Sequence, residues 1–309
     1  MLVVIALGGN ALLRRGQSMT PDAQRENVAK AAEAIAEIAR EHRLVVTHGN
    51  GPQIGLLAEQ LSSRSNETRF ALDVLGAETQ GMIGYIVESE LASLLPCTEI
   101  ATLITQVVVD PSDPAFRNPT KPIGRTYLQS EIRRLEADFG WKFVDEGKGF
   151  RRVVPSPKPR QIREINAIRL LAAAGVLVIC AGGGGIPVVI DKGSGAIVGI
   201  EAVIDKDRSA ALLAAELKAD ALLMLTDVSW VCTEWGSTRA RGIRRATPAG
   251  LRHYRFLEGS MGPKVEAASA FVTETGGIAA IGALSDASAM LKGEAGTYMT
   301  TTGPDITWY

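Results

Sequence analysis

Three glycine-rich stretches each follow an apolar run, and their residue types suit a site that binds an anion. They are Gly8-Gly9-Asn10, Gly49-Asn50-Gly51 and Gly182 to Gly185. Glycine permits a positive φ and a close approach of backbone N–H groups to a ligand, and the helix N-terminus after such a turn adds partial positive charge. One such stretch alone is equally compatible with a plain tight turn. Three of them at one sheet edge indicate a pocket for a phosphate or an acyl phosphate.

A site for phosphoryl chemistry also needs positive charge, yet no lysine or arginine stands in or just before the first glycine pair, where Ala6 precedes Leu7. Lys206 lies between Asp205 and Asp207 at the entry to an apolar helix. Two flanking carboxylates would keep this lysine protonated and fix its direction. The alternative is a solvated helix start with an aspartate cap.

Two further lysines could contribute charge. Lys264 follows a Gly-Pro turn at another helix entry, and Lys121 lies between two prolines in "NPTKPIG". Each of them alone also fits an ordinary surface lysine. Phosphoryl transfer, however, spreads negative charge over several oxygens, so its catalysis is mostly positioning and cationic stabilisation. Lysines that converge on glycine turns would provide both.

Other kinds of site are disfavoured by the sequence. No segment matches the Walker A pattern, and no G-x-G-x-x-G opens a helix. The three cysteines, Cys97, Cys180 and Cys232, are scattered without metal-type spacing, so no zinc site is expected. Scattered single thiols also suit a protein of a reducing compartment. The 33 basic and 34 acidic residues nearly cancel, so no overall field favours nucleic acid or an acidic membrane.

These residues would be positioned by strands and helices that alternate along most of the chain. Apolar runs that are each followed by a helical pattern predict an α/β fold with a parallel sheet covered on both faces. The predicted strands are 2–7, 43–48, 98–109, 175–185 and 220–228, with 276–284 as the last clear one. The predicted helices are 20–42, one that ends near 61, 72–95, 160–174, 205–219, one from Lys264 to about 275, and 285–293.

A segment rich in proline, charge and aromatic residues interrupts this pattern after Asp110. Residues 111–154 hold one short helix candidate near 128–138 and are too long for an ordinary connection. They are predicted to form an inserted lid subdomain. A lid could exclude water from a labile acyl phosphate.

The first apolar run does not match a signal peptide, because it is short, lacks a basic leader and continues into glycines rather than a cleavage site. No stretch approaches the roughly 20 apolar residues that a membrane helix requires. The sequence therefore predicts a cytoplasmic protein without a membrane or nucleic-acid partner.

Taken together, the motifs resemble those of the carbamate kinases, in the same order and over essentially the whole chain. They are "ALGGNALL", "THGNGPQIGLL", "LDVLGAETQGMIGY", "NPTKPIG", "RRVVPSPKP", "AGGGGIPV", "VIDKD", "LTDV", "GSMGPKVEAA" and "IGAL…GEAGT". The resemblance implies the amino-acid-kinase fold across 1–309, a three-layer αβα sandwich with a mainly parallel central sheet, and commonly a homodimer. It also implies the Mg²⁺-dependent reaction ATP + carbamate ⇌ ADP + carbamoyl phosphate.

The resemblance also implies roles for individual residues, and none of them binds the metal. Lys121 from the insertion, Lys206 and Lys264 would be catalytic, with Asp207 orienting the lysines. The residues that would frame the substrate are Gly8, Gly9, Asn10, Gly49, Asn50, Gly51, Gly183 and Gly184. The residues that would border the nucleotide are Lys206, Thr226, Asp227, Val228, Met261, Gly262 and Lys264.

The chain departs from its relatives at some positions. Acetylglutamate and uridylate kinases carry a lysine just before the glycine pair, so Ala6 favours the carbamate branch. Arg125 stands where that branch often has proline, which would alter the lid hinge. Residues 229–243 form a variable loop on the nucleotide side. His48 is interpreted as structural, because carbamate already carries a nucleophilic oxyanion.

Two alternatives stay open at this stage. The same fold could phosphorylate another small acid, or the chain could be a catalytically silent regulator that binds nucleotide. For a carbamate kinase, the expected direction is ATP synthesis from carbamoyl phosphate in catabolism. Arginine fermentation and the breakdown of ureido compounds are both possible sources of that substrate.

Overall fold

The structure, a computed structural model, describes residues 1–9, 12–13, 17, 20–62, 70–257 and 259–309. In this part of the chain the largest sheet holds ten strands, and its middle strands run parallel. Across the sheet they are β13 (Cys232–Thr233), β14 (Arg241–Ala246), β16 (Thr297–Met299), β15 (Ile278–Ala283), β12 (Ala221–Thr226), β1 (Leu2–Leu7), β2 (Arg43–His48), β9 (Leu177–Ile179) and β3 (Ile100–Thr102), with β17 (Ile306–Trp308) paired to β14.

The first strand shows why this sheet lies at the centre of the molecule. Beyond its first residue β1 is fully buried, and it pairs in parallel with both β2 and β12. Its side chains alternate between two apolar cores, Val3 and Ile5 in one and Val4 and Ala6 in the other. A strand that is apolar on both faces requires a cover on both faces.

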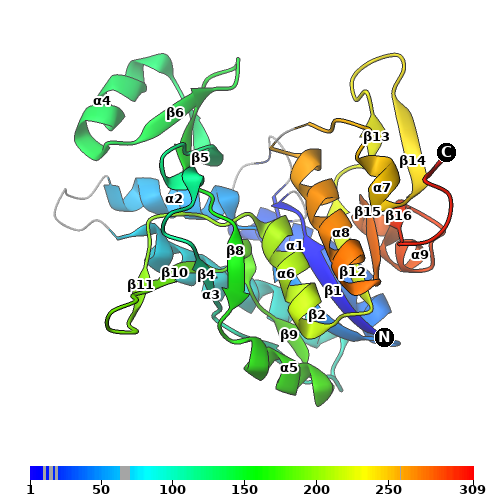
Figure 1. The fold of residues 1–309 in the computed structure, drawn as a ribbon. Coiled ribbons are helices and arrows are strands. Elements are labelled where there is room, and N and C mark those ends of the chain that lie inside the picture. The colour runs from blue at the N-terminus through cyan, green and yellow to red at the C-terminus, as the bar shows by residue number, and fades with distance from the viewer. Residues whose placement is uncertain (10–11, 14–16, 18–19, 63–69, 258) are drawn as a thin grey trace.

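Helices cover the two faces and make a three-layer αβα sandwich (Figure 1). The first of them begins at a capped position, because Thr20 Oγ1 accepts from the backbone N–H of Ala23 and Pro21 takes the first helical position. One face packs α1 (Pro21–Ala39), α3 (Leu72–Leu94) and α9 (Ala287–Leu291), and the other packs α5 (Ile165–Ala173), α6 (Lys206–Leu217) and α8 (Met261–Thr275).

Two smaller sheets lie beside the large one, and the first of them contributes Val107, Val109 and Ile162 to the same apolar core as α5, α6 and α8. One contains β11 (Ile197–Gly199), β10 (Ile186–Ile190), β4 (Gln106–Val109) and β8 (Pro159–Ile162). The other contains β5 (Lys121–Tyr127), β7 (Phe150–Val154) and β6 (Lys142–Asp145), and with α4 (Gln129–Phe139) it makes the lobe at the upper left of Figure 1. The remaining elements are α2 (Gly51–Ser62), α7 (Pro248–Leu251) and the 3₁₀ turns Pro114–Phe116, Gly182–Gly184 and Leu284–Asp286.

The lobe, residues 121–154, has a small apolar core of its own. Tyr127, Ile132 and Trp141 are buried in it, and the two aromatic rings meet edge to face with centroids 6.3 Å apart. These elements fall within the predicted insertion 111–154. Its strands were not predicted, because proline and charge mask the alternating pattern.

The predicted fold class is confirmed, but several boundaries were wrong. Strand 98–109 is two strands in different sheets, because the chain leaves the large sheet where Thr105 N bonds the Gln80 side chain. Helix 160–174 begins only at Ile165, since the residues before it form β8. Strands β16 and β17 follow the one predicted to be last. Among the described residues, no helix is long and apolar enough to cross a membrane.

Candidate active site

A cavity of about 810 Å³ opens where β1, β2 and β12 end, between the lobe and the N-terminus of α8. It collects most of the residues that sequence reasoning had singled out, although they come from segments far apart in the chain. Those that line it are Gly8, Gly9, Gly49, Asn50, Gly51, Lys121, Gly183, Lys206, Asp207, Thr226, Asp227, Val228, Met261 and Lys264.

Three predicted residues are not among the lining ones. Asn10 lies outside the described residues. Gly184 is buried behind the wall, where its carbonyl accepts from Ser209 Oγ at 2.6 Å and so ties the third glycine turn to α6. Gly262 lies in the first turn of α8, and its N–H donates to the carbonyl of Leu257 at 2.9 Å.

The glycine turns pack too tightly to admit side chains at two positions. A Cβ on Gly8 would lie 2.7 Å from the carbonyl oxygen of Leu225. A Cβ on Gly183 would lie 2.1 Å from Asn50 Nδ2, and its φ of +67° already disfavours other residues. Asn50 Nδ2 in turn donates to Thr79 Oγ1 at 2.9 Å. The turns therefore support one another and leave backbone groups along the cavity wall.

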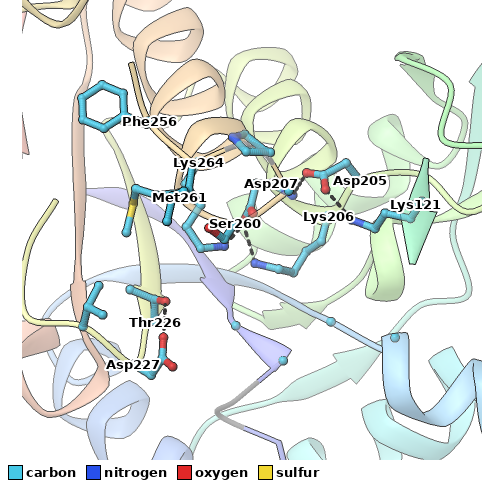
Figure 2. A pocket seen from close by; sticks show the side chains of 18 of the residues that line it. Lys121, Asp205, Lys206, Asp207, Thr226, Asp227, Phe256, Ser260, Met261 and Lys264 are labelled. Atoms are coloured by element: carbon cyan, nitrogen blue, oxygen red, sulfur yellow. Dashed lines mark hydrogen bonds and ion pairs between the residues drawn. The ribbon is translucent and has the colours of Figure 1, made fainter. Parts of the chain in front are cut away.

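A buried group of charges faces these turns (Figure 2). Lys206 Nζ donates to Asp207 Oδ1 and Lys264 Nζ donates to Asp207 Oδ2, each at 2.6 Å. The Asp207 side chain is only 7% exposed. Two lysines share one carboxylate, so this group has a net positive charge and suits a polyanionic ligand.

The pKa values reflect that burial. Burial opposes ionisation of Asp207, yet the charges of Lys206 and Lys264 outweigh it and hold the pKa of Asp207 well below its usual range. Burial lowers the pKa of Lys206, and the adjacent Asp207 offsets this only in part. The lysine is oriented as predicted, but its surroundings do not simply favour the protonated form.

The second flanking carboxylate has a different partner from the one expected. Asp205 Oδ1 accepts from the N–H groups of Asp207 and Arg208 and so caps α6, while its Oδ2 forms an ion pair with Lys121 of the lobe. Burial raises the pKa of Asp205, but the charge and hydrogen bond of Lys121, together with the charge of Lys206, outweigh it, so the net shift of the pKa is downward. Lys206 was expected between two carboxylates, yet its ion pair is with Asp207 because the cap turns Asp205 toward the lobe.

His48 lies beneath the turns, buried and outside the cavity lining. Its Nδ1 is 3.0 Å from the carbonyl oxygen of Gly49. A Cβ on Gly182 would come within 2.3 Å of the imidazole ring, so the ring fills the space under that glycine. Burial lowers the pKa of His48 to about 4, and the charge of Lys206 adds to the effect. A neutral, packed imidazole matches the structural interpretation of this residue.

Sequence reasoning missed the apolar half of the cavity. Trp230, Trp235 and Phe256 line it opposite the glycine turns, together with Met261 (Figure 2 shows Phe256 and Met261). Trp230 also stacks on Tyr309, with ring centroids 4.4 Å apart. The two tryptophans belong to the segment 229–243, which is predicted as a variable loop on the nucleotide side without individual contacts; its two tryptophans were the available signal.

The profile of the amino acid kinase family matches residues 1–281. A carbamate kinase of Rhizobium meliloti is 52% identical over 311 residues, which cover 100% of this chain and 96% of the relative. A carbamate kinase of Haemophilus influenzae is 50% identical, with 100% of both chains covered. Among solved structures, carbamate kinase from Giardia lamblia bound to AMP-PNP superposes with a TM-score of 0.88 at 39% identity, covering 97% of this chain and 98% of the other.

A parallel αβα sandwich with a lysine-rich cavity at its strand ends thus defines a phosphotransferase. The chain belongs to the amino acid kinase family and, within it, to the carbamate kinases. The resemblance inferred from its motifs is therefore confirmed.

Proposed function

We propose that the chain catalyses ATP + carbamate ⇌ ADP + carbamoyl phosphate and works toward ATP synthesis. The observation that carries the proposal is one cavity in which Lys206, Asp207 and Lys264 face the glycine turns. Full-length similarity to carbamate kinases supports this acceptor over another small acid. The presence of every predicted lysine in the cavity argues against a silent regulator.

The glycine turns bind the carbamoyl phosphate. The backbone at Gly9 and Gly183 faces the anion, and Gly51 adds the positive end of the α2 dipole. Gly8 and Gly49 shape the turns, because their N–H groups donate to the carbonyl oxygens of Leu225 and Leu7. Asn50 anchors the second turn to α3 through Thr79 and packs against Gly183 of the third turn. Gly184 contributes from behind the wall by fixing the third turn to α6. Asn10 is proposed as a further contact to the substrate, on the resemblance alone.

The two core lysines stabilise the charge that develops on the transferred phosphoryl group. Asp207 positions both ammonium groups, so they need no reorganisation when the reaction occurs. Lys121 enters from the lobe and exchanges its partner Asp205 for a substrate oxygen. The lobe then acts as a lid, because it brings a charged side chain and an apolar core of its own over the site.

The nucleotide occupies the remaining half of the cavity. Thr226, Asp227, Val228 and Met261 border it, and Gly262 shapes the first turn of α8 behind them. The tryptophan and phenylalanine side chains provide an apolar surface for the base. The Giardia lamblia relative bound to AMP-PNP supports a nucleotide site in this fold.

Mg²⁺ accompanies the nucleotide. No cluster of three or more metal-ligating side chains is found in the part of the chain that the structure describes. Mg²⁺ is usually held by one or two carboxylates together with substrate phosphates and water. Asp227 in the cavity wall suits that arrangement, a role that the motifs had not implied. When bound, the ion neutralises part of the phosphate charge.

The remaining features of the proposal follow from the family and from the surface. We propose a cytoplasmic homodimer that binds neither nucleic acid nor membrane. Exposed apolar side chains on α3, namely Val74, Met82 and Tyr85, offer a face for the second copy. The scattered cysteines and the near-zero net charge suit the cytoplasm.

The test is ATP formation from ADP, Mg²⁺ and carbamoyl phosphate by the wild type, by Lys206→Ala and by the surface control Lys192→Ala. Removal of one preorganised charge from a buried site costs about 3–4 kcal/mol, so Lys206→Ala should lose about 10²–10³-fold in kcat. Lys192→Ala should match the wild type. An inactive wild type that still binds ADP would instead favour another acyl phosphate or a regulatory role.

A further inference from the structure

The helix α2 and the strand β5 touch through their backbones. A Cβ built on Gly55 of α2 would lie 1.9 Å from the Cα of Gly124 in β5. Gly124 has a φ of +71°, which other residues adopt only with strain. No side chain fits between these two segments, so their separation is set by direct backbone contact.

Apolar packing surrounds this contact. Ile123, next to Gly124, is 1% exposed and belongs to one small core with Ile54 and Ala58 of α2 and Val154 of β7. This core is separate from the aromatic core inside the lobe. The base of the lobe is therefore packed onto α2.

Arg125 makes further contacts between α2 and the lobe at the junction of α2 with β5, on its solvent side. Arg125 Nε donates to Glu59 Oε1 of α2 at 2.8 Å, and its NH2 group donates to Glu131 Oε1 of α4 at 2.7 Å. Its guanidinium also lies 4.2 Å from the ring centroid of Tyr127. One side chain thus joins α2, β5 and α4.

Both partners of the junction lead directly into the cavity. Helix α2 begins at Gly51 in the second glycine turn, and β5 begins at Lys121. Gly55 lies four positions after Gly51, and Gly124 lies three positions after Lys121. We propose that Gly55, Gly124 and Arg125 are positioning residues that hold Lys121 in register with the second glycine turn, so that the two move as one unit. The inference rests on the proposed function.

The expected effect follows from the contact distance. Ordinary carbon contacts are about 3.5–4.0 Å, so a methyl group at Gly55 must push β5 away by more than about 1 Å. A misplacement of about 1 Å can cost about 10²-fold in rate. The displacement affects Lys121, whereas Thr226, Met261 and the other nucleotide-side residues belong to elements outside this junction.

The first test compares Gly55→Ala with the control Gly193→Ala, which lies in an exposed turn where the nearest atom to an added Cβ is 3.5 Å away. Gly55→Ala should lower kcat/KM for carbamoyl phosphate about 100-fold and change the Kd of ADP less than about 3-fold. Gly193→Ala should leave both at the wild-type value. Parallel losses in ADP affinity and in carbamoyl phosphate use would overturn the proposal, because general destabilisation would then explain them.

The second variant, Arg125→Gln, keeps the backbone contact and changes a partly exposed side chain, so it serves even if Gly55→Ala does not fold. It should raise KM for carbamoyl phosphate several-fold, with ADP affinity unchanged, and speed hydrogen exchange in residues 121–127 but not in 221–226. Wild-type kinetics and exchange in Arg125→Gln would overturn the proposal. A wild type inactive on carbamoyl phosphate would count against the proposed function. The hydrogen exchange of residues 121–127 in Arg125→Gln would still show whether the junction holds Lys121 in register with the second glycine turn.

Discussion

Replacement of Asp207 by asparagine isolates the electrostatic role of the buried carboxylate. Both of its oxygens accept from lysine ammonium groups at 2.6 Å, and its side chain is 7% exposed. Asparagine keeps the size of the side chain but removes the charge and turns an N–H₂ group toward one lysine. Two buried ammonium groups would then share no counter-charge.

The magnitude can be worked out from that geometry. Removal of one partner from a buried ion pair costs about 3–5 kcal/mol. The entropy of unfolding is about 2.1 cal/mol/K per residue, so for 309 residues this cost lowers the unfolding midpoint by about 5–8 °C. The loss of Asp207 also removes the charge that supports the protonated form of Lys206, so the pKa of Lys206 falls further.

The pH dependence has a definite sign. The folded-state pKa of Asp207 lies well below its unfolded value of about 3.9, so the carboxylate contributes its full stability above about pH 4 and loses it as the pH falls through the folded value. The difference between wild type and Asp207→Asn should therefore be largest near neutral pH and should shrink below about pH 4.

The assay is thermal unfolding of the wild type, Asp207→Asn and Asp138→Asn at pH 7 and at pH 3.5, with kcat measured at pH 7. Asp138 forms an exposed pair with Arg134, so its variant should lose less than about 1 kcal/mol and serves as the control. The reasoning is refuted if Asp207→Asn unfolds within about 1 °C of the wild type at pH 7 and retains its kcat.

Three further substitutions test neighbouring parts of the site. Asp205→Asn keeps an oxygen to cap α6 but loses the charge that pairs with Lys121, so kcat/KM for carbamoyl phosphate should fall about 10-fold. Calorimetry should show unchanged ADP affinity, and a large loss of ADP affinity would contradict the assignment of Lys121 to the carbamoyl phosphate side. Gly183→Ala places a methyl group against Asn50 at φ +67° and should cost about 1–3 kcal/mol in chemical denaturation, whereas wild-type stability would mean that the turn relaxes freely. The pKa of His48 is lowered from 6.5 to about 4, so between these pH values the unfolded state binds a proton that the folded state does not. The free energy of unfolding should therefore fall by about 3 kcal/mol as the pH drops from 6.5 to 4, and His48→Asn should lack this pH dependence. The same pH slope in the wild type and in His48→Asn would exclude this role of His48.

The sequence by itself determined the class of fold and the chemistry of the site. Strand β1 is apolar at every position and runs into two glycines, which already requires a sheet covered on both faces and a turn open to an anion. Lys121, Lys206 and Lys264 could be predicted as site residues from local context and from motif order, and all three line one cavity. Such features are local, because backbone conformation and helix capping depend on neighbours in the chain.

Which side chains become partners was decided only by the tertiary structure. Asp205 and Asp207 both flank Lys206 in sequence, yet the helix cap directs Asp205 to Lys121, 84 positions away. The split of 98–109 between two sheets and the apolar wall formed by Trp230 and Trp235 likewise depend on distant segments. Ion pairing, close backbone contact and shared burial depend on distance in space, and periodicity along the chain carries no information about that distance.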